Sequence, residues 1–144
     1  MIVGIGIDLI EVARMERAIS RHPERLIQRV FTETEQRECQ GHIRPAMQYA
    51  ARFAAKEAFL KAVGLGLRDG MRWRDVGVVH APSGKPSLAV QGRAAERMRE
   101  LGADRALVSL THTDSHACSV VILEDSSALP AARRDNQISS DSEQ

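Results

Sequence analysis

The sequence has 144 residues, of which 43% are hydrophobic and 27% are charged. This length gives room for one domain with a substantial core and is too short for two ordinary ones. The composition is typical of a soluble globular protein, and no stretch approaches the roughly 20 apolar residues of a membrane helix. The start lacks a signal-peptide pattern, and Cys39 and Cys118 lack the spacing of a zinc site or a disulfide framework. We therefore expect a cytoplasmic protein with reduced thiols.

The formal net charge is +1, but it is unevenly distributed. The last 20 residues hold four acids and two bases, so residues 1–124 carry 18 basic and 15 acidic side chains. A mildly basic body favours an acidic partner without identifying one. Aromatic residues make up only 3% of the chain, so the core must be mainly aliphatic. Small cores of this kind often gain stability by oligomerising.

The first half of the chain is predicted to be mainly helical. β-Forming residues alternate with Gly4 and Gly6 near the start, and hydrophobic residues then recur at spacings of three and four. The predicted elements are a strand over 1–9 and helices over 11–21, 24–30, a stretch after Thr32, and 45–63. Thr32 and Glu35 form a capping box for the third of these helices. The last helix is rich in Ala, which permits close approach of a neighbouring backbone or of a ligand, and Gly64 is expected to end it.

The second half is predicted to hold most of the strands. The predicted elements are strands over 75–81, 87–91, 106–111 and 117–123, with a helix over 92–101. Polar residues 112–116 join the last two strands as in a hairpin. From Ser126 the composition turns to Ser, Ala, Asp and Gln without periodicity, so we expect a domain over 1–125 and a disordered tail over 126–144. The pattern predicts an α+β domain with a helical first half and a mostly antiparallel sheet.

Asp8 is the first candidate functional residue. A carboxylate at the end of a buried strand is costly unless it is paired or bound to a cation. The alternative is that Asp8 caps the helix that starts near residue 11. The residues alone leave both interpretations open.

The segment Arg52–Lys61, with the sequence RFAAKEAFLK, is the second candidate. On a helix Glu57 and Lys61 are one turn apart and share a face, and Arg52 and Lys56 share another. The alternative is a solvated helix with ordinary ion pairs, worth ~0.3–0.5 kcal/mol each. Spacing alone does not distinguish a site from such a helix.

Three other patterns are weaker. His112, Asp114 and His116 alternate and could bind a metal from a straight strand, but a turn over 113–115 would break the alternation and leave a polar hairpin tip. The early glycines lie inside a strand, so they do not form a dinucleotide-binding fingerprint. A basic run forms either a solvated face or a dock for an acidic protein or nucleic acid. It comprises Arg14, Arg17, Arg21, Arg25 and Arg29.

Four motifs, in this order, resemble the holo-acyl-carrier-protein synthase family. They are Gly4-Ile5-Gly6-Ile7-Asp8, the Arg52–Lys61 segment, Gly84-Lys85-Pro86 and Ser109-Leu110-Thr111-His112. The similarity covers about residues 1–124. It implies a 4′-phosphopantetheinyl transferase-like domain that assembles as a homotrimer with active sites between subunits. It also implies transfer of 4′-phosphopantetheine from coenzyme A to a serine of apo-acyl carrier protein, releasing adenosine 3′,5′-bisphosphate, in fatty-acid or polyketide synthesis.

The resemblance also implies roles for individual residues. Asp8 and Glu57 are expected to bind Mg²⁺, which takes hard oxygen ligands, and Lys61 to bind phosphate, so that these three residues are catalytic. The expected coenzyme A contacts are Lys56, Lys61, Gly64, Gly66, Gly84, Lys85, Pro86 and His112. The residues expected to dock the carrier protein are Arg14, Arg21 and Arg25. The general base could be Glu57 or a metal-bound water.

The partners implied are coenzyme A, acyl carrier protein and further copies of the chain, with no nucleic acid and no membrane. Two functions of other classes also fit parts of the sequence. A nucleic-acid-binding module would use the arginine face and would not need Asp8 or Glu57. A metal-dependent phosphohydrolase would use the same two carboxylates and release phosphate from coenzyme A without any carrier.

Overall fold

The computed structural model describes residues 1–128. The elements are β1 (Ile2–Glu11), α1 (Val12–Arg21), α2 (Pro23–Val30), α3 (Glu33–Gln40), α4 (Pro45–Val63), the 3₁₀ turn η1 (Trp73–Asp75), β2 (Val76–His80), β3 (Pro86–Val90), α5 (Gly92–Glu100), β4 (Arg105–His112), β5 (His116–Glu124) and the 3₁₀ turn η2 (Ser126–Ala128). Every predicted helix and strand is present, with ends shifted by two residues at most, so the α+β class is confirmed.

The C-terminal boundary differs slightly from the prediction. Ser126, expected in the tail, begins η2 and donates its backbone N–H to Asp104 Oδ1 at 2.9 Å. The remainder of the predicted tail, residues 129–144, lies outside the described residues. Among residues 1–128, no helix is long and apolar enough to cross a membrane.

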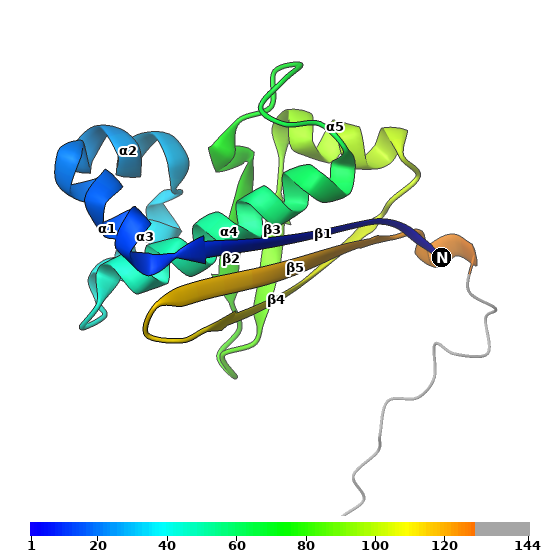
Figure 1. Ribbon diagram of the computed structural model, residues 1–144. Coiled ribbons are helices and arrows are strands. Elements are labelled where there is room, and N and C mark those ends of the chain that lie inside the picture. Colours follow the sequence, from blue (N-terminus) through cyan, green and yellow to red (C-terminus); the bar gives the residue numbers. More distant parts are fainter. Residues whose placement is uncertain (129–144) are drawn as a thin grey trace, which may run out of the picture.

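The strands form two separate antiparallel sheets. In the larger sheet β5 lies between β1 and β4, and in the smaller one β2 pairs with β3. The long helix α4 packs against β1 and β5, with α1, α2 and α3 gathered at one end of it and α5 near the other (Figure 1). One hydrophobic cluster surrounds the C-terminal half of α4, and a second surrounds its N-terminal half. The helix α4 therefore contributes to both parts of the core, as does β5.

The outer face of the larger sheet is apolar along β1 and β5. Ile5, Ile7 and Leu9 of β1 point to this face and are between 61% and 66% exposed. Their partners on β5 are, in the same order, Ile122, Val120 and Cys118. An antiparallel sheet with one solvated face normally shows polar side chains there. Strands β1 and β5 instead present a continuous apolar surface, which we call the outer sheet face.

The contact between β1 and α4 requires glycine at two positions. A Cβ on Gly6 would lie 1.8 Å from the carbonyl oxygen of Ala58, and a Cβ on Gly4 would lie 2.5 Å from that of Ala62. Atoms cannot approach so closely, so any side chain at either position would push the strand away from the helix. The predicted close approach of a backbone to the Ala-rich helix is confirmed.

We expect Gly6→Ala to destabilise the fold by ~1–3 kcal/mol or more, because the added methyl overpacks the contact with Ala58. Gly41→Ala is the matched control, since its Cβ would meet its nearest neighbour at an ordinary 3.6 Å. Thermal unfolding followed by circular dichroism measures both variants. A Gly6→Ala variant that melts with the wild type would show that the strand–helix contact tolerates a side chain.

Candidate active site

Asp8 lies within β1, and Lys61 of α4 contacts it. The Asp8 side chain is 16% exposed, and its Oδ1 lies 3.2 Å from Lys61 Nζ. The same ammonium group donates to the carbonyl oxygen of Ile7 at 2.9 Å, and its side chain is 54% exposed. The alternative role for Asp8, capping the first helix, is wrong, because the N-cap of α1 is Glu11 and no side chain caps it. Asp8 is instead paired with a cation that reaches solvent.

Glu57 is a half-buried residue of α4, one turn before Lys61. Burial raises the pKa of Glu57, and the charge of Asp8 raises it further, whereas Lys61 and Arg14 oppose the shift. These charges act on one another, so Asp8, Glu57 and Lys61 form one electrostatic cluster, with Arg14 beside it. Two neighbouring carboxylates disfavour each other's ionisation, and the pair therefore attracts a proton or a metal cation.

The donor atoms of this cluster suit Mg²⁺. Within residues 1–128, no group of three or more His, Cys, Asp or Glu side chains could hold a metal ion. The turn between β4 and β5 separates His112 from His116, so their alternation creates no such group. The chain thus offers the two carboxylates of Asp8 and Glu57, and an ion there would take its other ligands from phosphate and water. Mg²⁺ is commonly bound in that way.

Lys56 is buried on another side of α4 and does not join the cluster. Its side chain is 1% exposed, and its Nζ lies 2.7 Å from Glu35 Oε1. It also donates to the carbonyl oxygens of Trp73, at 3.2 Å, and Val76, at 2.5 Å. An ammonium group has three donors, and these three acceptors use them all. The geometry therefore does not support the predicted contact of Lys56 with coenzyme A.

The partner of Lys56, Glu35, was predicted only as a capping residue. The capping box is confirmed, since the N–H of Thr32 donates to Glu35 Oε1 at 2.9 Å and the N–H of Glu35 donates to Thr32 Oγ1 at 3.2 Å. The same carboxylate is fully buried and also accepts the N–H of Val78 at 3.0 Å. Burial lowers the pKa of Lys56, and the charge of Glu35 opposes that shift. The Glu35–Lys56 pair thus joins α3, α4 and β2.

The other predicted coenzyme A contacts lie in separate places. Gly64 ends α4 in the left-handed conformation, at φ +74°, and Gly66 follows it. Residues 84–86 lie where β2 turns into β3, at a tip that Figure 1 shows well away from the C-terminal end of α4. His112 is the last residue of β4. Within residues 1–128, neither His112 nor residues 84–86 form a hydrogen bond or ion pair with the cluster.

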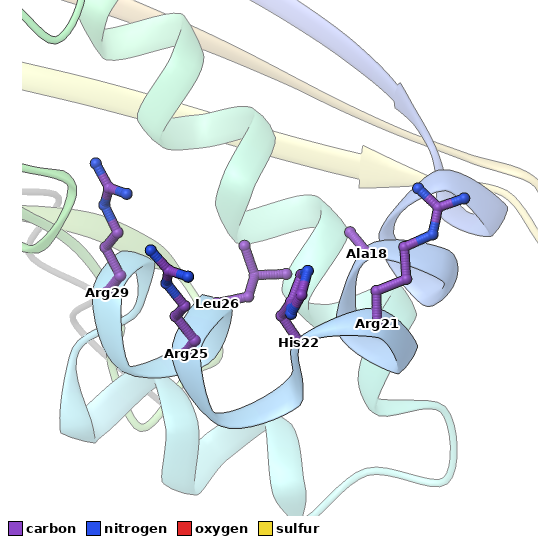
Figure 2. Close-up of a pocket in the computed structure, with 6 residues that line it drawn as sticks. All are labelled: Ala18, Arg21, His22, Arg25, Leu26 and Arg29. Carbon is purple, nitrogen blue, oxygen red and sulfur yellow. The ribbon is translucent and has the colours of Figure 1, made fainter.

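Two of the predicted docking residues, Arg21 and Arg25, line a hollow of about 360 Å³ between α1 and α2 (Figure 2). Its complete lining is Ala18, Arg21, His22, Arg25, Leu26 and Arg29. The hollow, which we call the first hollow, thus combines small and apolar side chains with a basic rim. Arg14 does not line it and lies nearer the active site, where its charge acts on Glu57. Arg29 belongs to the first hollow although the predicted docking set omitted it.

Comparison with known proteins gives the family. The model of the 4′-phosphopantetheinyl transferase superfamily matches residues 4–121. The chain is 47% identical over 124 residues to the holo-[acyl-carrier-protein] synthase of Geobacter sulfurreducens, which covers 86% of this chain and 98% of that protein. The chain belongs to the 4′-phosphopantetheinyl transferase superfamily.

Two solved structures are similar in fold. One is the holo-[acyl-carrier-protein] synthase of Neisseria meningitidis, with a TM-score of 0.79 and 32% identity over 86% of this chain and 99% of that chain. The other is a holo-(acyl-carrier-protein) synthase of Bacillus anthracis in complex with CoA (3′,5′-ADP), with a TM-score of 0.72 and 34% identity over 88% of this chain and 99% of that chain. Both matches span nearly the whole of the compared proteins.

We expect Lys56→Met to lower the free energy of unfolding by ~3–5 kcal/mol, because it leaves the Glu35 carboxylate buried without its cation. The double variant Glu35→Gln with Lys56→Met should recover part of this loss, since it removes both charges. Urea unfolding followed by circular dichroism gives the free energy of each variant. Equal stability of Lys56→Met and the wild type would show that the fold does not depend on the pair.

Proposed function

We propose that this chain transfers the 4′-phosphopantetheine group of coenzyme A to a serine of apo-acyl carrier protein and releases adenosine 3′,5′-bisphosphate. The observation that carries the proposal is the cluster of Asp8, Glu57 and Lys61 in a member of this superfamily. Relatives that match over nearly their full length bear the name of this reaction. The cluster offers two carboxylates and a half-exposed ammonium group, which suits a reaction at a pyrophosphate.

The reaction is a substitution at phosphorus. The serine Oγ forms a new bond to the phosphorus of the phosphopantetheine group, and the pyrophosphate P–O bond to adenosine 3′,5′-bisphosphate breaks. Lys61 neutralises negative charge on the phosphoryl oxygens. The serine proton must pass to a base, and we propose the Glu57 carboxylate for this role.

We assign Mg²⁺ to Asp8 and Glu57. When bound there, the ion neutralises charge on the pyrophosphate of coenzyme A. Binding requires both carboxylates to be ionised, and a raised pKa of Glu57 means that protons compete with the metal. Metal affinity should therefore fall as the pH is lowered.

We further propose a homotrimer in which neighbouring chains complete each site. The outer sheet face supports this, because large contiguous apolar patches mark protein–protein interfaces. The position of residues 84–86 at the turn between β2 and β3, well away from the C-terminal end of α4, supports it too, since another copy could supply them. We place the enzyme in the cytoplasm, in keeping with its two free cysteines.

We propose that the acidic carrier protein docks on α1 and α2. The apolar part of the first hollow, with Leu26, suits an apolar side chain of the carrier, and the arginine rim suits carboxylates around it. Arg14, which acts electrostatically on Glu57, links this surface to the active site. A carrier bound here would present its serine to the catalytic cluster.

We expect Asp8→Asn and Glu57→Gln each to reduce transfer by roughly 10²-fold or more, because each removes a metal ligand and Glu57→Gln also removes the base. The intact mass of apo-carrier after incubation with coenzyme A and Mg²⁺ measures transfer, and circular dichroism verifies the fold. Glu33→Gln, an exposed acid on α3, is the control and should leave transfer unchanged. Full transfer by either active-site variant would refute the assignment.

We expect Ile5→Lys to convert the protein to a monomer and to abolish transfer, because it places a charge on the outer sheet face. Ile43→Lys is the matched control, since Ile43 is 100% exposed and lies off the sheet. Light scattering coupled to size exclusion gives the mass of each protein at micromolar concentration. A fully active monomeric wild type, or a trimeric Ile5→Lys variant, would contradict the proposed assembly.

A further inference from the structure

A second basic hollow, of about 470 Å³, adjoins the first hollow. Arg29, at the end of α2, lines both of them. The other basic residues of the second hollow are Arg72 and Arg74, which flank Trp73 in and just before η1. The two hollows therefore form one basic surface that runs from α1 to the segment before β2.

The charge of the second hollow is largely uncompensated. Within residues 1–128, Arg29, Arg72 and Arg74 form no side-chain hydrogen bond and no ion pair. Asp75 is the one acid of its lining, and its carboxylate lies against Gly92, where a Cβ would be 3.0 Å from Oδ1. Three guanidinium groups thus surround a cavity that holds one carboxylate.

The segment that carries Arg72 and Arg74 is held in place from within the protein. Lys56 donates to the carbonyl oxygen of Trp73, which lies between the two arginines, and to that of Val76, two residues after Arg74. The Trp73 ring packs on Phe53, with 5.1 Å between the ring centroids. A partner therefore meets arginines whose backbone is already ordered, which reduces the entropy lost on binding.

We propose that the second hollow is a further docking contact for the acidic carrier protein, in addition to the surface of α1 and α2. This rests on the proposed function. One acidic group of the carrier binds at the first hollow, and a second acidic group binds between Arg72 and Arg74. Arg29 lies between the two contacts. The second contact adds affinity and fixes the rotation of the carrier about the first one, because two separated charge contacts define an orientation.

Two features favour a protein over a nucleic acid as the occupant. The first hollow includes Ala18 and Leu26, against which an apolar side chain of a protein partner can pack. The Trp73 ring packs on Phe53 and is partly buried, so it is not a free platform for a base. Carboxylates arranged around an apolar side chain match the combined surface.

The test is steady-state kinetics of the full chain with each substrate varied in turn. For Arg72→Glu with Arg74→Glu we expect the KM for the carrier to rise by about tenfold or more, because like charges then face the acidic carrier. The KM for coenzyme A should stay within about twofold, since these residues are not assigned to coenzyme A. Rising salt should increase the carrier KM of the wild type and affect this variant less.

The control is Arg37→Glu with Arg99→Glu, which makes the same change in net charge at exposed arginines that line neither hollow. Its carrier KM should match that of the wild type. Arg72→Gln with Arg74→Gln tests the same contact with a milder change, and a smaller rise of the carrier KM is expected. Circular dichroism verifies that each variant is folded.

Three results would overturn the proposal. An unchanged carrier KM in Arg72→Glu with Arg74→Glu, beside a raised one in Arg14→Glu with Arg21→Glu, would reject the second contact and leave the proposed function standing. A rise in the coenzyme A KM alone would assign the second hollow to the nucleotide. Salt-sensitive binding of an RNA oligonucleotide that this variant loses, with its carrier KM unchanged, would make the surface a nucleic-acid site. Absence of transfer by the wild type would instead reject the proposed function itself.

Discussion

The active site depends on the direct contact between strand β1 and helix α4, which the absence of side chains at Gly4 and Gly6 makes possible. Each glycine lies against a carbonyl oxygen of the helix, so the strand runs as close to α4 as a backbone can. Asp8 follows Gly6 by two residues and therefore points to the same side of the strand. There it contacts Lys61 of α4, and its charge raises the pKa of Glu57 on the same helix. A strand held even slightly further away would separate the two carboxylates.

A buried ion pair anchors the same helix on another side. Lys56 is adjacent to Glu57 in the chain, but its ammonium group binds Glu35 and two backbone carbonyls inside the protein. Removing one partner of such a pair is costly because the remaining charge stays buried. The helix α4 is thus held by its contacts with Gly4 and Gly6 on one side and by the Glu35–Lys56 pair on another. Glu57 lies between these two sets of contacts. The pair also holds η1, so the catalytic cluster and the second hollow share one support.

Local sequence signals were sufficient to predict the helices and strands. The Thr32–Glu35 capping box, the hydrophobic spacing of the first helices and Gly64 after the long helix each determine an element through its own residues. The partition into two sheets was not predictable in this way, because strand pairing depends on contacts between distant segments. The same limit applies to the outer sheet face. The alternation in β1 separates Ile5, Ile7 and Leu9 from Gly4, Gly6 and Asp8 but does not say which set a helix covers.

The site was predictable to a different extent for each residue. Asp8, Glu57 and Lys61 were assigned through the family resemblance, and the structure brings them together. Lys56 was predicted to contact coenzyme A, and its buried pairing with Glu35 does not support that contact. Helical spacing shows which residues share a face but not what packs on it. The ion-pair partner of Lys56, Glu35, was predicted from the sequence only as a capping residue of α3. Arg72 and Arg74 lie in a stretch without periodicity, so nothing in the sequence linked them to Arg29.

The most direct test of the central claim is the stoichiometry of the products when the chain is incubated with coenzyme A, Mg²⁺ and apo-acyl carrier protein. Chromatography quantifies the adenosine 3′,5′-bisphosphate released, and peptide mass spectrometry quantifies phosphopantetheine on the carrier serine. The proposed transfer predicts equal amounts of the two products and no release of the nucleotide without the carrier. Release of phosphate or nucleotide from coenzyme A in the absence of the carrier, with no modified serine in its presence, would contradict it and indicate a hydrolase.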